Sequence, residues 1–189
     1  MPADLLVVGL GNPGSEYAKT RHNVGADVVE LLASRHGASL KKSRRDHALV
    51  GDVRIGSVRV VLAVPTTYMN DSGQAVAPLA KHYDVPVDRI VVVHDELDLP
   101  PAELKLKEGG GLAGHNGLRS IKHHLHSEDF LRVRIGVGKP PSKERGADHV
   151  LSKVSKRDRE EMAVTVEQAA DAVECIATDG IQAAMNRFN

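Results

Sequence analysis

The sequence contains a single cysteine and no apolar run long enough to cross a membrane. A spanning helix needs about 18 consecutive apolar residues, and a secretory leader would show a basic segment followed by an apolar core. We therefore expect no membrane contact and a cytoplasmic location. One cysteine cannot form an internal disulfide. Cys175 falls among apolar residues of an amphipathic segment, which predicts a small buried core residue.

An excess of charge of one sign is also missing, since 25 basic residues balance 25 acidic ones. This argues against a generally basic nucleic-acid binder but leaves room for local basic patches. Three groups are present: Lys41, Lys42, Arg44 and Arg45 in an expected loop, Lys105 and Lys107 on one face of an expected strand, and Arg132 and Arg134 on one face of another. Each group is either an ordinary solvated surface or part of a phosphate-binding track.

A chain of 189 residues with 41% hydrophobic content can bury one sizeable core, so we expect a single domain over residues 1–189. Apolar runs predict strands near residues 4–9, 47–55, 58–64, 89–94, 102–107 and 131–138. Helical spacing of apolar residues predicts helices near 24–36, 74–83, 117–126, 155–178 and 181–188. Gly56 and Ser57 suit a hairpin turn. The mixture of hairpin and crossover signals predicts an α/β fold with a central mixed, twisted sheet flanked by helices.

Individual residues mark helix boundaries. Ser155 and Asp158 form a capping-box start for the helix near 155–178, and Gly180 is a stop signal at its end. Pro78 must either kink the helix near 74–83 or lie in its first turn, because an interior proline costs on the order of 3 kcal/mol.

The most informative segment covers residues 8–25, where Asn12, Tyr17, His22 and Asn23 follow an apolar strand. Ligands of α/β sheets bind beyond the carboxyl ends of the strands, so these polar residues are candidates for a site. The segment also contains the dinucleotide pattern G-x-G-x-x-G. Two features argue against that cofactor: a proline within the loop removes a backbone donor for a pyrophosphate, and Glu30 falls on a helix rather than at the end of a second strand.

A hydrolytic centre can be assembled from residues that follow three different strands. His22, Asn70 and Asp95 can meet at the strand ends. A histidine can take a proton from water at neutral pH, and a carboxylate on its other nitrogen fixes the tautomer. We expect His22 to be the general base, Asp95 to orient it, and Asn12 and Asn70 to position water or donate to an oxyanion. Considered alone, His22 could be structural, Asp95 a helix cap and Asn70 a turn residue.

Other reaction centres find less support. His123, His124 and His126 are spaced so that they do not share a helical face, and no cysteine or carboxylate accompanies them at zinc-ligand spacing. The G-x-S-x-G elbow of a serine nucleophile is absent; Ser72 and Gly73 instead predict a turn and a helix start. We therefore expect no metal and no cofactor, and direct attack by water.

Four ordered signatures resemble those of a known family. The first, G-L-G-N-P-G-x-x-Y-x-x-T-R-H-N-x-G, covers residues 9–25, and the second, P-T-T-Y-M-N followed by S-G, covers residues 65–73. The third is H-D-E-L-D-L-P at residues 94–100, and the fourth is G-H-N-G-L at residues 114–118. Together they resemble the signatures of the bacterial peptidyl-tRNA hydrolases.

The resemblance implies hydrolysis of the ester between a peptide and the 3′-terminal ribose of tRNA, by a monomer that needs no cofactor. It supports the four catalytic roles given above. It also implies a substrate cleft formed by Tyr17, Tyr68, Met69, His115 and Asn116. Considered alone, Tyr17 and Met69 could be packing residues, and Asn116 could cap the following helix while it holds substrate. Lys105 and Arg134 match the family's basic residues near the 5′-phosphate of the acceptor stem.

Two other functions stay open at this point. A non-enzymatic RNA-binding protein would use Lys105, Lys107, Arg132 and Arg134 for phosphate, but it would leave His22 and Asp95 without a role. A ribonuclease would cut the RNA itself. Product analysis distinguishes these functions from ester hydrolysis.

Overall fold

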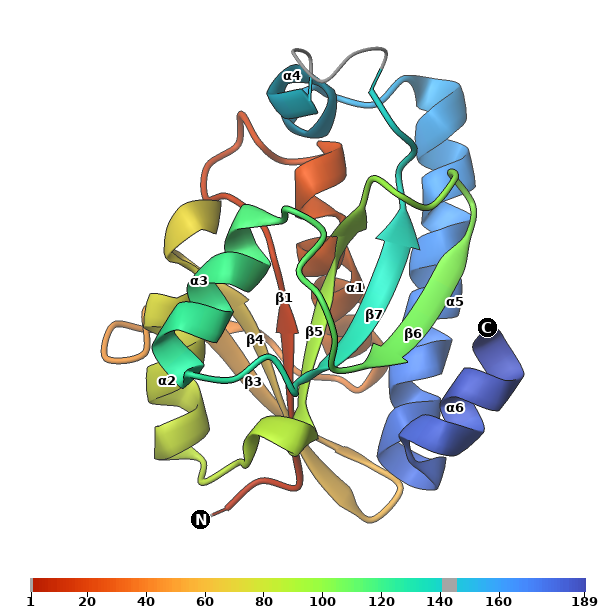
Figure 1. The fold of residues 1–189 in the computed structure, drawn as a ribbon. Helices are drawn as coiled ribbons and strands as arrows, with labels where there is room; N and C mark the ends of the chain where they lie inside the picture. The colour runs from red at the N-terminus through yellow and green to blue at the C-terminus, as the bar shows by residue number, and fades with distance from the viewer. Residues whose placement is uncertain (1, 141–145) are drawn as a thin grey trace.

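The computed structural model describes residues 2–140 and 146–189. The described residues form a seven-stranded sheet with the order β2-β3-β4-β1-β5-β7-β6 (Figure 1). The strands are β1 (Leu5–Gly9), β2 (Lys41–Ser43), β3 (Ala48–Ile55), β4 (Val58–Pro65), β5 (Ile90–Glu96), β6 (Leu104–Glu108) and β7 (Leu131–Gly136). β4, β1, β5 and β7 pair in parallel, whereas β2, β3 and β6 pair in antiparallel fashion. The prediction of a mixed sheet is confirmed.

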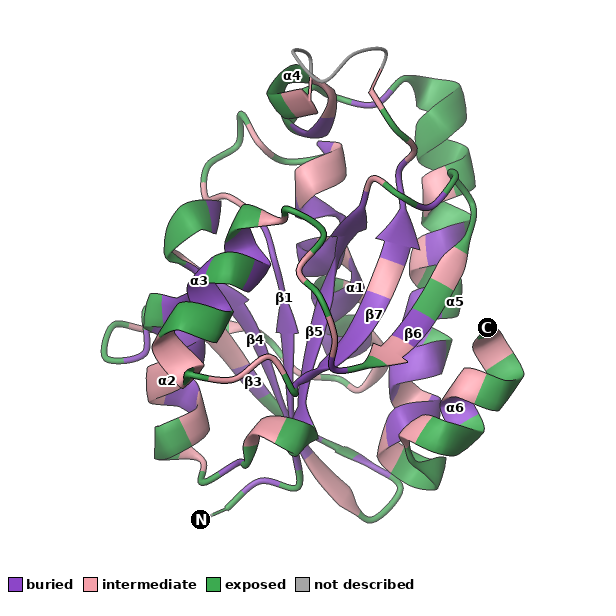
Figure 2. Cartoon of the chain, in the orientation of Figure 1, coloured by how far each residue is buried: buried purple, intermediate pink, exposed green. Residues whose placement is uncertain are grey.

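Helices cover both faces of this sheet. α2 (Gly73–His82) and α3 (Asn116–Leu125) lie on one face, and α1 (Val24–Arg35), α5 (Lys156–Asp179) and α6 (Ile181–Phe188) lie on the other (Figure 1). β1 and β5 are buried along their whole length (Figure 2), as expected for central parallel strands between two helical layers. In the described part of the chain, no helix combines the length and the apolar character that crossing a membrane requires.

Two glycines allow α1 to lie directly against the sheet. A Cβ atom at Gly9 would lie 2.2 Å from the carbonyl oxygen of Gly25, and a Cβ atom at Gly25 would lie 2.1 Å from the carbonyl oxygen of Val93. A side chain at either position would therefore push α1 away from β1 and β5. The close approach brings His22, in the 3₁₀ turn Arg21–Asn23 just before α1, to the end of β5.

Most sequence-predicted boundaries are confirmed. Ser155 accepts a hydrogen bond from the backbone N–H of Asp158 at the start of α5, and Gly180, with a φ of +91°, ends that helix. Cys175 is buried as expected, with 6% of its surface exposed. Pro78 lies inside α2, in its second turn, so of the two alternatives predicted for this proline the first-turn position is excluded.

Two short elements were not predicted. Lys41 and Lys42 lie in β2 rather than in a loop; their segment has no apolar alternation, and only its pairing with β3 makes it a strand. The helix α4 (Gly146–Leu151) has one buried residue, Val150, and is too short to show helical periodicity in the sequence. α4 lies beyond the carboxyl ends of the central strands, where it contributes to the site described next (Figure 1).

Candidate active site

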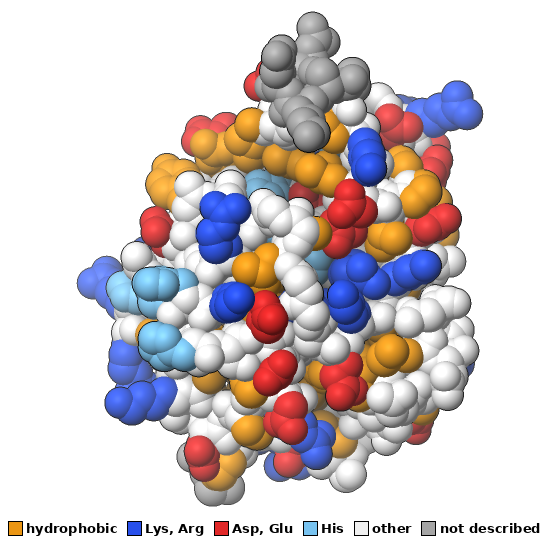
Figure 3. Space-filling view, viewed as in Figure 1, with side chains coloured by type: hydrophobic (Ala, Val, Ile, Leu, Met, Phe, Trp, Pro, Cys, Tyr) orange, Lys and Arg blue, Asp and Glu red, His pale blue; other side chains and the backbone are white. Residues whose placement is uncertain are grey.

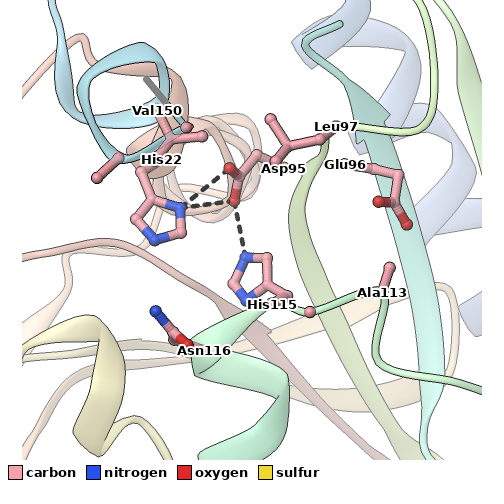
Figure 4. A pocket seen from close by; sticks show the side chains of 11 residues that line it. His22, Asp95, Glu96, Leu97, Ala113, His115, Asn116 and Val150 are labelled. Atoms are coloured by element: carbon pink, nitrogen blue, oxygen red, sulfur yellow. Dashed lines mark hydrogen bonds and ion pairs between the residues drawn. The ribbon is translucent and has the colours of Figure 1, made fainter. Parts of the chain in front are cut away.

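His22 and Asp95 form the centre of the site. Nδ1 of His22 lies 2.9 Å from Oδ1 and 3.0 Å from Oδ2 of Asp95 (Figure 4). An ionised carboxylate only accepts hydrogen bonds, so Nδ1 carries a proton, and in the neutral ring Nε2 then presents a lone pair. The side chain of His22 is 11% exposed and that of Asp95 is 2% exposed. A neutral imidazole with a buried carboxylate behind it has the geometry of a general base and its orienting group.

Asp95 has a second histidine donor, which the sequence did not reveal. Nε2 of His115 lies 2.8 Å from Oδ1 of Asp95. Nδ1 of His115 accepts hydrogen bonds from the backbone N–H groups of Gly117, at 3.0 Å, and Leu118, at 3.3 Å. Since Nδ1 is an acceptor, Nε2 must carry the proton. His115 is thus the N-cap of α3, and the expectation that Asn116 caps this helix is wrong because Asn116 is the first helical residue.

The two histidines decide the charge state of Asp95. Burial by itself works to raise the pKa of this carboxyl, but the electrostatic and hydrogen-bond interactions with His115, followed by those with His22, outweigh burial and hold the pKa well below its usual range. Asp95 is therefore ionised at neutral pH. Figure 4 shows the two imidazole rings pointing toward this carboxylate from two sides.

The same three side chains deserve a test as a metal centre. Ligand atoms of His22, Asp95 and His115 lie within 4.8 Å of one another, and no other group of this kind occurs in the described parts of the chain, including at His123 and His124. However, Nδ1 of His115 accepts two backbone hydrogen bonds, so its Nε2 is protonated and has no lone pair for a cation. The donor set therefore fits a hydrogen-bonded network better than a metal site.

Asn12 is fixed beside His22 by a second asparagine. The backbone N–H of Asn12 donates to Oδ1 of Asn23 at 2.8 Å, and Nδ2 of Asn23 donates to the carbonyl oxygen of Asn12 at 2.9 Å. Oδ1 of Asn12 accepts from the backbone N–H of Met69 at 2.6 Å, which leaves its NH₂ group as a donor. The sequence placed Asn23 in the polar cluster but gave it no role; its buried amide supports Asn12.

Two cavities meet at His22. One, of about 340 Å³, is lined by Asn12, Tyr17, His22, Tyr68, Met69, Asn70, Asn116, Ala147, Val150 and Leu151. The other, of about 210 Å³, lies on the side of His115 and is lined by His22, Asp95, Glu96, Leu97, Ala113, Gly114, His115, Asn116, Gly146, Ala147 and Val150. All the catalytic and cleft residues expected from the sequence therefore come together around His22, whereas the two basic residues expected at the 5′-phosphate lie outside both cavities.

The cavity walls differ in exposure. Met69 is only 3% exposed, so it both packs in the core and lines the larger cavity, and both sequence-based interpretations of it hold. Tyr17 and Tyr68 meet edge to face with ring centroids 6.3 Å apart, and Tyr68 is 57% exposed. These rings give the larger cavity an aromatic wall on the side away from Asp95.

α4 lines part of both cavities, and the sequence did not predict this contribution. Ala147 and Val150 line both cavities. Nη1 of Arg21 donates to the carbonyl oxygen of His149 at 3.1 Å and to Oγ of Ser152 at 3.3 Å. These bonds attach the segment around α4 to the turn that carries His22. No sequence motif marks α4, and only tertiary contacts show its place in the site.

Lys105 and Arg134 lie directly opposite each other on β6 and β7. Lys105 is exposed, and the side chain of Arg134 is 23% exposed, with Nη1 lying 4.0 Å from Oε1 of Glu96. Figure 3 shows basic side chains gathered over β6 and β7 on the face that also carries the glycine-rich loop at residues 109–114. Lys107, on the same face of β6, is partly buried.

Arg132 is different, and the expectation that it belongs to a phosphate-binding track is wrong. It is 1% exposed, and its guanidinium donates to the carbonyl oxygens of Gly110 at 2.9 Å, of Glu128 at 2.8 Å, and of Gly111. The same group lies 4.2 Å from the ring centroid of Phe130. Strand alternation correctly placed Arg132 on the face of Arg134, but the glycine-rich loop covers it there.

Known proteins share this sequence and fold. A family model described as "Peptidyl-tRNA hydrolase" matches residues 6–189. The peptidyl-tRNA hydrolase of Kineococcus radiotolerans is 51% identical over 97% of this chain and 96% of its own length, and that of Mycobacterium marinum is 51% identical over 100% and 99%. The crystal structure of peptidyl-tRNA hydrolase from Acinetobacter baumannii has a TM-score of 0.94 and 44% identity, covering 100% of this chain and 96% of that one. The chain therefore belongs to the peptidyl-tRNA hydrolase family.

Proposed function

We propose that this peptidyl-tRNA hydrolase uses Nε2 of His22 as the general base, and that the ester is cleaved beside it, where the two cavities meet. The observation that carries the proposal is the hydrogen bond from Nδ1 of His22 to Asp95, which in the neutral ring leaves the lone pair on Nε2. The reaction is hydrolysis of the ester between the peptide and the 3′-terminal ribose of tRNA. Neither a metal nor another cofactor is needed, because hydrolysis of an ester requires only a placed water, a base and a stabilised oxyanion.

The residues divide the work as follows. Nε2 of His22 takes a proton from water as the water oxygen attacks the ester carbonyl. The imidazolium that forms is stabilised by the buried carboxylate of Asp95. The amide of Asn12, which is fixed by Asn23 and Met69, donates to the oxyanion or holds the water, and Asn70 offers a second neutral amide. When the intermediate collapses, the ester bond to the ribose oxygen breaks and the imidazolium returns its proton to that oxygen.

The remaining cleft residues hold the substrate. Tyr17, Tyr68 and Met69 form an apolar wall for the peptide or the terminal nucleoside, while His115 and Asn116 line the opposite side. Lys105 and Arg134 bind the 5′-phosphate of the acceptor stem, since paired cations on neighbouring strands suit a phosphate. All of these residues come from one chain, so the site needs no residue from a second copy, and we propose that the enzyme acts as a monomer in the cytoplasm, where its substrate is made.

One assay tests this function. Purified protein is incubated with a tRNA that carries an N-blocked aminoacyl group, and both the ester and the RNA are followed. We expect loss of the ester while the RNA stays whole. Cut RNA would indicate a ribonuclease, and unchanged substrate that nevertheless binds would indicate a non-enzymatic RNA-binding protein; either result would overturn the proposal.

A further inference from the structure

His94 is a buried histidine to which the proposed mechanism gives no role. It precedes Asp95 on β5 and is 1% exposed. Because side chains alternate along a strand, His94 lies on the face of Ile90 and Val92, beneath α2 and α3, while Asp95 lies on the other face. Burial of an imidazole costs free energy unless its nitrogens are hydrogen-bonded.

The tautomer of His94 is fixed by the backbone. Its Nδ1 lies 2.8 Å from the carbonyl oxygen of Asp95, and a carbonyl only accepts, so Nδ1 carries the proton. Nε2 is buried and has no hydrogen-bond partner among the described residues. Burial, with the neighbouring His115 and Arg132 as further causes, lowers the pKa of His94 to about 3. The ring is therefore neutral at neutral pH.

The neutral ring of His94 packs against His115. The two ring centroids lie 5.1 Å apart at an interplanar angle of 70°, an edge-to-face arrangement. His115 is thus held on three sides: by His94, by the backbone N–H groups that its Nδ1 caps, and by Asp95, to which its Nε2 donates at 2.8 Å. If the His115 ring tilted about its capping nitrogen, Nδ1, the hydrogen bond from Nε2 to Asp95 would lengthen first, because Nε2 is the nitrogen farther from the cap.

From these contacts we infer that His94 is a positioning residue for the hydrolytic centre: it holds His115 in place and so controls how the charge of Asp95 is shared between His115 and His22. This inference rests on the proposed function of His22 and Asp95 and adds to it a buried residue that touches neither substrate nor base. His94 must be neutral for this role, since a charged ring would be repelled by the nearby guanidinium of Arg132.

The role has a measurable consequence in the pH profile. When His115 donates to Asp95, part of the carboxylate's charge is neutralised, and the proton on Nε2 of His22 that blocks catalysis is held less tightly. Loss of that donor should therefore raise the acidic midpoint of the kcat/KM profile, which reports protonation of the free enzyme's base. The charged or titratable groups around the network are His22, Asp95, Glu96, His115, Arg132 and Arg134.

A matched pair of variants separates the ring contact from the backbone hydrogen bond. His94→Asn keeps an N–H near the position of Nδ1 but removes the ring that supports His115, whereas His94→Phe keeps a ring and removes the donor. We expect His94→Asn to lower kcat about tenfold and to raise the acidic midpoint by about half a pH unit, with tRNA affinity unchanged. His94→Phe should keep the wild-type midpoint. Val92→Ala, a buried substitution on the same face of β5, should lower Tm without moving the midpoint.

A double-mutant cycle tests whether His94 acts through His115. His115→Asn retains an N-cap acceptor for α3 but loses the donor to Asp95. If the inference is right, adding His94→Asn to His115→Asn lowers kcat little further, because the bond that His94 supports is already absent. Additive losses, or an unchanged midpoint in His94→Asn, would overturn the inference.

A measurement on the wild type keeps the inference testable even if the variants fold poorly. Histidine ¹⁵N NMR of the intact protein should show His94 as the neutral Nδ1–H tautomer from about pH 5 to about pH 8. In the neutral form of His115, the proton should be on Nε2. Titration of His94 within that range, or the opposite tautomer of His115, would overturn the inference. This spectrum does not depend on turnover, so it also distinguishes failure of the His94 role from failure of the proposed function, which His22→Ala tests.

Discussion

Nδ1 of His22 lies 2.9 Å from Oδ1 of Asp95, although the two residues are 73 positions apart in the sequence. The contact exists because the amino terminus of α1 rests on the carboxyl end of β5, with glycine at the points of closest approach. Asp95 is 2% exposed and borders only the smaller cavity, whereas His22 borders both, so the imidazole separates the carboxylate from the larger cavity.

Removal of the base is the first test of this arrangement. His22→Ala should lower kcat by roughly 10²–10⁴-fold, since this is the usual contribution of a general base, while tRNA affinity stays close to that of the wild type. Single-turnover hydrolysis of N-blocked aminoacyl-tRNA and a tRNA-binding assay measure the two effects. His123→Ala, an exposed histidine on α3, is the matched control and should retain full activity. Near-normal turnover in His22→Ala would refute the assignment.

Asp95→Asn probes the orienting group. An amide carries no charge, and its NH₂ group would face Nδ1 of His22 at the position where Oδ2 of Asp95 now accepts. We expect turnover to fall by about 10²–10⁴-fold, because the histidine tautomer is no longer fixed and the imidazolium is no longer stabilised. Circular dichroism and thermal unfolding should show a folded variant. If Asp95→Asn instead melts at the assay temperature, Asp95 has a mainly structural role.

The basic pair on β6 and β7 should recognise the 5′-phosphate. Lys105→Ala and Arg134→Ala should each weaken tRNA binding and reduce the slope of log Kd against log salt by about one, since one fewer counterion is released. Turnover at saturating substrate should largely survive. The decisive comparison uses substrates with and without the 5′-phosphate: variants that keep the wild-type preference for the phosphorylated substrate would exclude the pair from this role.

Hydrolysis should not depend on a metal or a nucleotide cofactor. A chelator and added NAD should both leave turnover unchanged. Among the described residues, His22, Asp95 and His115 have the spacing of metal ligands, but Nε2 of His115 donates a hydrogen bond to Asp95 and has no lone pair for a cation. The measurement is the initial rate before and after dialysis against the chelator. Activity that falls with the chelator and returns with zinc would revive a metal centre at His22, Asp95 and His115.

Asp27 should make stability depend on pH. Burial in the apolar groove between α1 and α5 raises the pKa of its carboxyl to about 7, and the charge of Glu30 adds to the shift. A folded-state pKa above the unfolded value of 3.8 means that the native state binds the proton more tightly. The free energy of unfolding therefore falls as pH rises from the unfolded to the folded value, and it stays lower above about pH 7.

Asp27→Asn should remove this dependence. Urea unfolding at about pH 5 and about pH 8 should show that the wild type loses stability between the two conditions and that the variant loses less. Glu160→Gln, on the exposed face of α5, should behave like the wild type. An equal loss in Asp27→Asn and the wild type would show that Asp27 does not titrate in this range.

The sequence by itself determined the strands that pass through the core and the residue types of the site. Continuous apolar runs such as 5–8 and 90–93 bury on both faces and can be recognised locally, and the four signatures name the polar residues at the strand ends. The α/β class and the placement of His22 near Asp95 follow from these patterns, because parallel strands direct their carboxyl ends to one edge of the sheet. The order of the strands came only from the structure.

Only the tertiary structure decided which atoms of these residues meet. His115 caps α3 with Nδ1 and donates a hydrogen bond to Asp95 with Nε2. Both contacts depend on loop geometry that no local pattern encodes. Arg132 and Arg134 are equivalent in strand alternation, yet the glycine-rich loop buries one and leaves the other accessible. Similarly, α4 and β2 are too short to carry a periodic signal and owe their structure to the elements they pack or pair with. Local sequence specifies the apolar faces, whereas long-range contacts select the hydrogen bonds.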